Sequence, residues 1–156
     1  MPKRIVIDSC VALKWRLRDE EELAQADALL DDFLLERLRL MVPTLFDYEI
    51  ANVLKVAVVR ERLDKEEADQ ILKAFQGYAL RRYDFIPLQQ RAFELAHLHQ
   101  RSVYDSAYLA LAQTRDVWFY TGDLKLFRGV SSALSWVKWI GDYNFNAIPE
   151  DSTETN

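Results

Sequence analysis

The sequence is poor in the residues that build disulfides and soft-metal sites. It has one cysteine, Cys10, so no internal disulfide is possible. Nothing indicates an oxidising compartment, and we expect a cytoplasmic location. The two histidines, His97 and His99, lie two positions apart on an expected helix and therefore point in different directions. These absences argue against a zinc site made of cysteine and histidine.

Long apolar runs and an excess of basic residues are also missing. No apolar run approaches the roughly 20 residues that span a bilayer, so we expect no membrane contact. The chain carries 20 Lys and Arg against 25 Asp and Glu, a formal net charge of -5. This balance argues mildly against a broad basic surface for nucleic acid. A cluster of carboxylates that binds cations would itself contribute to the negative charge.

The 156 residues have the length of one domain, in which short apolar strands alternate with helices. This alternation predicts an α/β fold, a three-layer α/β/α sandwich with a mostly parallel central sheet. We expect one domain over residues 1–148 and a disordered acidic tail over 149–156. The predicted strands are 5–8, 40–43, 117–121 and 135–141, with a short extended stretch within 81–88. The predicted helices are 20–39, 64–80, 89–100, 102–114 and 123–134, together with one that begins after Thr44. Asp64 is the expected N-cap of the helix at 64–80. Thr44 is expected to cap its own helix, with Asp47 as its capping-box partner.

Four acidic residues stand where these expected elements begin, end or face the core. Asp8 is the last residue of the first strand, and Asp123 follows the turn after the aromatic strand. The carboxyl ends of parallel strands share one edge of a sheet, where ligands bind, so both carboxylates should lie there. Glu49 shares the inward-leaning face of its helix. Asp105 opens an apolar helix, whose N-terminus favours negative charge.

Several carboxylates without thiolates or a histidine pair constitute a hard-oxygen site, for which Mg²⁺ or Mn²⁺ fits best. Such ions activate water and stabilise the oxygens of an in-line phosphoryl displacement. The pattern therefore predicts metal-dependent hydrolysis of a phosphodiester. Asp8, Glu49 and Asp105 would ligate one ion, and Asp123 would help with a second ion or position water.

Nearby polar and basic residues extend this expected site. Asn52 lies one helical turn after Glu49 and is placed to donate a hydrogen bond to it. Four basic residues that follow Asp8 and Asp123 in the sequence are the better candidates for contacts to a nucleic-acid backbone: Lys14, Arg16, Lys125 and Arg128.

Each acid also has an explanation without chemistry. Asp8 can simply terminate a strand, and Asp105 or Asp123 can cap a helix. A phosphotransfer or phosphatase domain that uses Asp8 as its nucleophile is a further alternative. Such domains place a second acid close to the first strand, whereas Asp8 is followed by Ser9 and Cys10.

The segments that carry these residues resemble the PIN-domain family, and more narrowly the VapC-type toxins of toxin–antitoxin pairs. They cover nearly the whole chain in the family's order and spacing, and VYDSAYLALA and the T-G-D turn are the most specific. The matching segments are IVIDSCVALKW (5–15), DYEIANVLKVAV (47–58), SVYDSAYLALA (102–112), YTGDLKLF (120–127) and WVKWIGDY (136–143).

The resemblance implies a Mg²⁺- or Mn²⁺-dependent endoribonuclease that forms a homodimer and is inhibited by an antitoxin encoded beside it. A binding module of the same fold that acts without catalysis remains as an alternative. The residues that correspond to the family's acidic quartet are Asp8, Glu49, Asp105 and Asp123, and those that correspond to its small polar residues are Ser9 and Thr121.

Overall fold

The computed structural model describes residues 1–151, which form one five-stranded sheet with helices on both sides. The strand order is β3-β2-β1-β4-β5, and each of the four neighbouring pairs is parallel. The strands are β1 (Lys3–Ile7), β2 (Leu38–Pro43), β3 (Arg81–Tyr83), β4 (Trp118–Thr121) and β5 (Val137–Trp139). The predicted parallel α/β sandwich is therefore confirmed.

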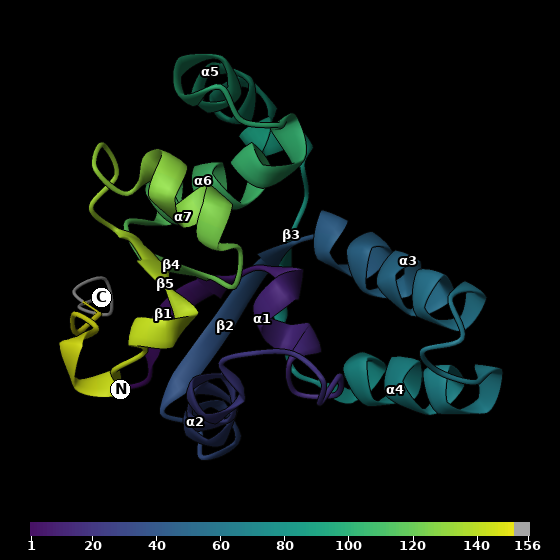
Figure 1. Ribbon diagram of the computed structural model, residues 1–156. Coiled ribbons are helices and arrows are strands. Elements are labelled where there is room, and N and C mark those ends of the chain that lie inside the picture. The colour runs from purple at the N-terminus through teal and green to yellow at the C-terminus, as the bar shows by residue number, and fades with distance from the viewer. Residues whose placement is uncertain (152–156) are drawn as a thin grey trace.

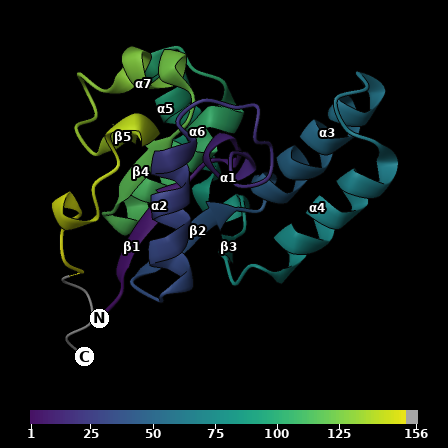
Figure 2. The ribbon, with the colours of Figure 1, turned by 60° about the horizontal axis from the view of Figure 1, so that its bottom comes forward.

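The helices make two layers around this sheet. Figures 1 and 2 show α5, α6 and α7 on one side and α1 and α2 on the other, while α3 and α4 form a hairpin that projects from the sheet. The helices are α1 (Ser9–Leu13), α2 (Leu23–Leu34), α3 (Leu45–Val59), α4 (Lys65–Gly77), α5 (Gln89–His99), α6 (Val103–Arg115) and α7 (Leu124–Val130). Short 3-10 turns lie at Ile86–Leu88, Ile140–Asp142 and Phe145–Ala147.

The core lies where α6 crosses the middle of the sheet. Every residue from 106 to 112 of α6 is buried, and α6 packs on α5 and on the strands β1, β2 and β4. Ile5, Val6 and Ile7 of β1 are completely inaccessible to solvent. An apolar run such as IVI suits a central parallel strand, because helices cover both of its faces. This rigid centre fixes the position of the residues that follow β1 and β4.

The helix caps confirm one prediction and correct another. Asp64 caps α4 and forms a reciprocal capping box with Glu67. Thr44, by contrast, has helical backbone angles and makes no side-chain cap, whereas a capping residue normally has extended ones. The predicted capping box of Thr44 with Asp47 is wrong, because the Asp47 carboxylate pairs with Arg82 next to β2.

Several predicted boundaries were also wrong. The helix expected over 20–39 is only α2, because the chain from Leu38 onward joins the sheet as β2. The short helix α1 was not predicted at all. The expected tail at 149–156 stays a prediction, since residues 152–156 lie outside the described residues. Asp151, which belongs to that range, forms an ion pair with Arg4. Within 1–151, no helix combines the length and apolarity that crossing a membrane requires.

Candidate active site

The site begins at the carboxyl ends of the central strands β1 and β4. These strands pair in parallel with Ile7 opposite Tyr120, so the next residues, Asp8 and Thr121, lie side by side. In the sheet, β2 lies next to β1 on one side and β4 lies next to β1 on the other, so the chain connections from β1 and to β4 run in opposite directions. Such a reversal of strand order is where open α/β sheets bind ligands. The predicted convergence of Asp8 with the turn after β4 is thus present.

Asp8 is held by three hydrogen bonds that converge on its carboxylate. Oδ2 accepts from the hydroxyl of Thr121 at 2.5 Å, and Oδ1 accepts from the backbone N–H groups of Val11 at 3.1 Å and Gly122 at 3.4 Å. Asp8 is only 5% exposed, and this burial raises its pKa to about 6, although the three hydrogen bonds act in the opposite direction. The carboxylate is therefore firmly oriented and costly to ionise.

Gly122 allows the end of β4 to approach α1 closely enough for this arrangement. A Cβ atom on Gly122 would lie 3.1 Å from Cβ and 3.2 Å from the backbone carbonyl carbon of Cys10. The backbone atom cannot move away as a flexible side chain can. The absence of a side chain at position 122 thus lets its N–H reach Asp8.

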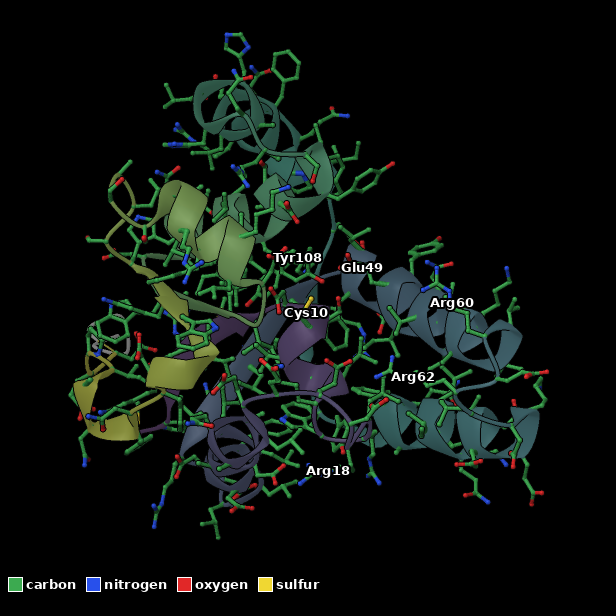
Figure 3. The ribbon with its side chains drawn as sticks, in the orientation of Figure 1. Cys10, Arg18, Glu49, Arg60, Arg62 and Tyr108 are labelled. Carbon is green, nitrogen blue, oxygen red and sulfur yellow. The ribbon has the colours of Figure 1, made fainter. Side chains whose placement is uncertain are left out.

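Glu49 comes to the same place from α3 and is bound by α6. The hydroxyl of Tyr108 donates to Glu49 Oε1 at 2.5 Å, and the Ser9 hydroxyl is a second hydrogen-bonding partner. Partial burial raises the pKa of Glu49, and the negative charge of Asp105 raises it further, against the effect of the two hydroxyls. Figure 3 shows Glu49 and Tyr108 beside Cys10, where α1, α3 and α6 meet.

Asp105 and Asp123 lie at the starts of two helices. Asp105 is in the first turn of α6, which Ser102 caps. Burial raises the pKa of Asp105 most, and the negative charge of Asp123 raises it further. Asp123 caps α7 by accepting from Leu126 N–H at 3.1 Å. Its own N–H donates to the Thr121 hydroxyl, the same hydroxyl that donates to Asp8.

The electrostatic effects join the four acids into one cluster. Glu49 raises the pKa of Asp8, Asp105 raises that of Glu49, and Asp123 raises that of Asp105. The Cys10 thiol lies among them, since the charges of Asp8, Asp123 and Glu49 together with burial raise its pKa. Four carboxylates from separate elements therefore repel one another across one small region.

The donor set matches a hard divalent cation, since it consists of carboxylate oxygens. Among residues 1–151, no three His, Cys, Asp or Glu side chains are already positioned as a group that could hold an ion. The Glu49 carboxylate, for example, is bound by the hydroxyls of Tyr108 and Ser9. A cation would therefore have to draw these carboxylates together, and it would relieve the repulsion that raises their pKa values.

The other predicted site residues are distributed unevenly. Asn52 is exposed, and within residues 1–151 no hydrogen bond joins it to Glu49, whose partners are Tyr108 and Ser9. Lys14 lies beside Gly122 but is buried, with Nζ donating to the carbonyl of Glu21.

The remaining basic candidates are on the surface. Arg16 is exposed, and its guanidinium donates to the hydroxyl of Tyr78, the residue that follows α4. Lys125 and Arg128 lie on the exposed side of α7, the helix that Asp123 caps. Of the four basic candidates, these two are thus free to meet a ligand near the acids.

Two residues that act on the acids were not predicted from the sequence. Tyr108 resembles any aromatic residue on an apolar helix, and only the folded structure shows that its hydroxyl meets Glu49 of α3. Arg101 precedes the cap of α6, and its positive charge lowers the pKa of Asp105. The sequence did offer a signal for this role, because Arg101 lies one residue before Ser102, the cap of the helix that carries Asp105 in its first turn.

Comparison with known proteins gives concordant matches. Residues 5–131 match the family model described as PIN domain. The chain is 33% identical to VapC ribonuclease Mb0985 of Mycobacterium bovis, over 78% of this chain and 87% of that protein. It is 30% identical to ribonuclease VapC12 of Mycobacterium tuberculosis, over 78% of this chain and 88% of that protein.

Solved structures share the fold. FitAB bound to an IR36 DNA fragment matches with a TM-score of 0.62 at 16% identity, over 90% of this chain and 97% of that chain. VapBC2 from Rickettsia felis, bound to a DNA fragment from its promoter, matches with a TM-score of 0.58 at 12% identity, over 87% and 96%. With the family model covering most of the chain, this protein belongs to the PIN-domain family.

Proposed function

We propose that this protein is a Mg²⁺- or Mn²⁺-dependent endoribonuclease and the toxin of a toxin–antitoxin pair. The observation that carries the proposal is the convergence of four carboxylates at the switch point of the sheet. The names of its relatives as ribonucleases support RNA as the substrate. We expect activity in the cytoplasm, where both RNA and an antitoxin are available.

In this proposal Asp8, Glu49 and Asp105 hold the metal. When bound, the ion supplies Lewis acidity that activates water and neutralises charge on the phosphate. Thr121 keeps Asp8 oriented through its hydroxyl, and Tyr108 limits the positions that Glu49 can take. Asp123 is fixed by its cap on α7 and would orient the attacking water or help hold a second ion.

A phosphotransfer role for Asp8 is disfavoured by the surroundings of this carboxylate. Both oxygens accept hydrogen bonds, and the residue is almost completely buried. A nucleophilic carboxylate must bring one oxygen into line with the phosphorus atom of its substrate, which this buried group, held by three hydrogen bonds, does not offer. Acyl-phosphate labelling of Asp8 is accordingly expected to give no stable adduct. A lone pair that remains on the carboxylate is sufficient to bind a cation.

The proposed partners are a second copy of the chain and an antitoxin. The proteins with similar structures include a toxin–antitoxin complex and VapBC2, which supports an antitoxin partner here. Large apolar side chains are exposed on and around α5, which supports a homodimer: Ile86, Phe93, Leu98 and Tyr104. Sedimentation of the purified chain, alone and with the product of the neighbouring gene, tests both partners.

Cleavage by charge-neutralising variants tests the proposed enzyme. Asp8→Asn and Asp105→Asn should each abolish Mg²⁺-dependent RNA cleavage while circular dichroism shows an intact fold. Asp69→Asn is the matched control, because this exposed carboxylate pairs only with Lys65 on α4. Normal cleavage by either site variant would refute the assignment. Antitoxin binding without cleavage by the wild type would favour a non-catalytic binding module.

A further inference from the structure

Arg101 is a positive charge beside the acidic cluster that has no carboxylate partner of its own. Its guanidinium lowers the pKa of Asp105, so the two groups lie close enough to interact. Among residues 1–151, however, no ion pair joins Arg101 to a carboxylate. Within the described part of the chain, its one side-chain hydrogen bond is a long one, from Nε to the His99 carbonyl at 3.4 Å. Both Nη groups therefore retain their capacity to bind an anion.

The Arg101 guanidinium lies against α7 at Gly129. A Cβ atom at Gly129 would lie 2.6 Å from Nη2, 2.8 Å from Cζ and 3.2 Å from Nη1 of Arg101. The planar group thus rests directly against the α7 backbone, in the space that a side chain at position 129 would enter. The Arg101 N–H also donates to the Ala96 carbonyl, which ties the junction between α5 and α6. In this structure the guanidinium is therefore positioned by its contact with α7 and by this junction.

The other cations near the site are differently engaged. The Lys14 ammonium is buried and bound to a backbone carbonyl, and Arg16 is bound to Tyr78. Lys125 and Arg128 extend from the exposed side of α7 without such a contact. Arg101 alone among these five combines a fixed position, unengaged donors and proximity to the acids.

We propose that Arg101 binds a phosphate oxygen of the RNA backbone next to the cleaved bond. This inference rests on the proposed function and adds a substrate-positioning residue to it. A phosphodiester approaching four carboxylates meets repulsion that a metal at the acids only partly removes. A guanidinium with two free Nη groups binds phosphate oxygens through charge-assisted hydrogen bonds in a fixed geometry. Arg101 would therefore draw the backbone toward Asp105 and the start of α6.

A purely structural role for Arg101 makes a different prediction. If the guanidinium served only to offset the charge of Asp105, its removal would change the Asp105 pKa and thermal stability. It would not change how RNA affinity depends on salt. Each phosphate contact contributes about 0.7 to the slope of log affinity against log salt for single strands. The salt slope therefore separates a phosphate contact from a structural one.

The experiment measures binding separately from cleavage. A short fluorescein-labelled single-stranded RNA of mixed sequence is titrated with the full chain carrying Asp8→Asn, across a series of KCl concentrations. Adding Arg101→Ala should weaken binding about tenfold and reduce the salt slope by about 0.7. Arg91→Ala is the matched control, because this arginine pairs with Glu94 on the exposed side of α5. The control should change neither quantity.

Gly129→Ala tests the contact between the Arg101 guanidinium and α7 without removing the positive charge. Gly129 has ordinary helical backbone angles, so alanine by itself favours α7 and does not weaken the fold. Its methyl group would displace the guanidinium, and RNA affinity should fall toward that of Arg101→Ala. Unchanged affinity and slope in Arg101→Ala would overturn the proposal, even if the wild type cleaves RNA. Absence of cleavage by the wild type would instead refute the proposed function, and the salt slope would still report on Arg101.

Discussion

Neutralising Asp8 should stabilise the metal-free protein, although Asp8 is central to the proposed activity. Burial raises the pKa of Asp8 from 3.8 to about 6, so between these values the folded protein holds a proton that the unfolded chain has released. The free energy of unfolding therefore falls as the pH rises through this window. A pKa difference of about two corresponds to about 3 kcal/mol, and the free energy of unfolding is lower by this amount above pH 6, where Asp8 is ionised.

Asp8→Asn removes the charge and keeps the size of the side chain. The amide oxygen can still accept from the N–H groups of Val11 and Gly122, so most of the local geometry is retained. At neutral pH and without metal, we expect the variant to be more stable than the wild type by about 1–3 kcal/mol. For a chain of this length each kcal/mol raises Tm by about 2–4 °C.

The assay is thermal unfolding in EDTA over a pH series, followed by circular dichroism. The two proteins should have similar Tm values below about pH 4, where Asp8 is protonated when folded, and should diverge as the pH rises toward 7. Asp69→Asn, at an exposed position, should show no such divergence. Mn²⁺ should then raise the Tm of the wild type but not that of Asp8→Asn. A variant that is less stable than the wild type by the same amount at every pH would refute the reasoning.

Three further substitutions test the parts around the acids. Tyr108→Phe removes the hydroxyl that donates to Glu49, so kcat for RNA cleavage should fall about tenfold while circular dichroism stays unchanged. Gly122→Ala should destabilise the fold by about 1–3 kcal/mol in urea unfolding, because its methyl group meets the Cys10 backbone; equal stability would contradict the close packing. Asp64→Ala should cost about 1 kcal/mol through loss of the α4 cap, with RNA cleavage unaffected.

The sequence was most informative where a residue's role depends on its own neighbours in the chain. Asp64 and Glu67 of the capping box are three positions apart in the chain, and the structure confirms the predicted N-cap. The strand that ends before Asp8 was visible as an IVI run, and the parallel sheet followed from the alternation of elements. From these features, the meeting of Asp8 with the end of β4 could be predicted.

Features that depend on contacts between distant residues were not predictable. Tyr108 meets Glu49 across 59 positions, and the pairing of Asp47 with Arg82, 35 positions away, replaced the local cap that had been expected. A local pattern does not reveal which of several possible partners wins in the folded chain. Likewise, nothing in the sequence near Gly129 indicates that Arg101 rests on it.

The role of Asn52 shows the same limit. Helical spacing places it one turn from Glu49, but the side chain is exposed, and the hydroxyls of Tyr108 and Ser9 act on Glu49 instead. Spacing along one helix identifies which residues share a face, and packing of the neighbouring elements α1 and α6 decides which donors reach the carboxylate.

Metal-dependent RNA cleavage by the purified chain is the most direct test of the central claim. Single-stranded RNA is incubated with protein in EDTA and then with an excess of Mg²⁺ or Mn²⁺, and the products are resolved on a denaturing gel. We predict no cleavage in EDTA, discrete fragments after either ion is added, and no fragments from Asp8→Asn under the same conditions. Cleavage that persists in EDTA, or that Asp8→Asn retains, would contradict this claim.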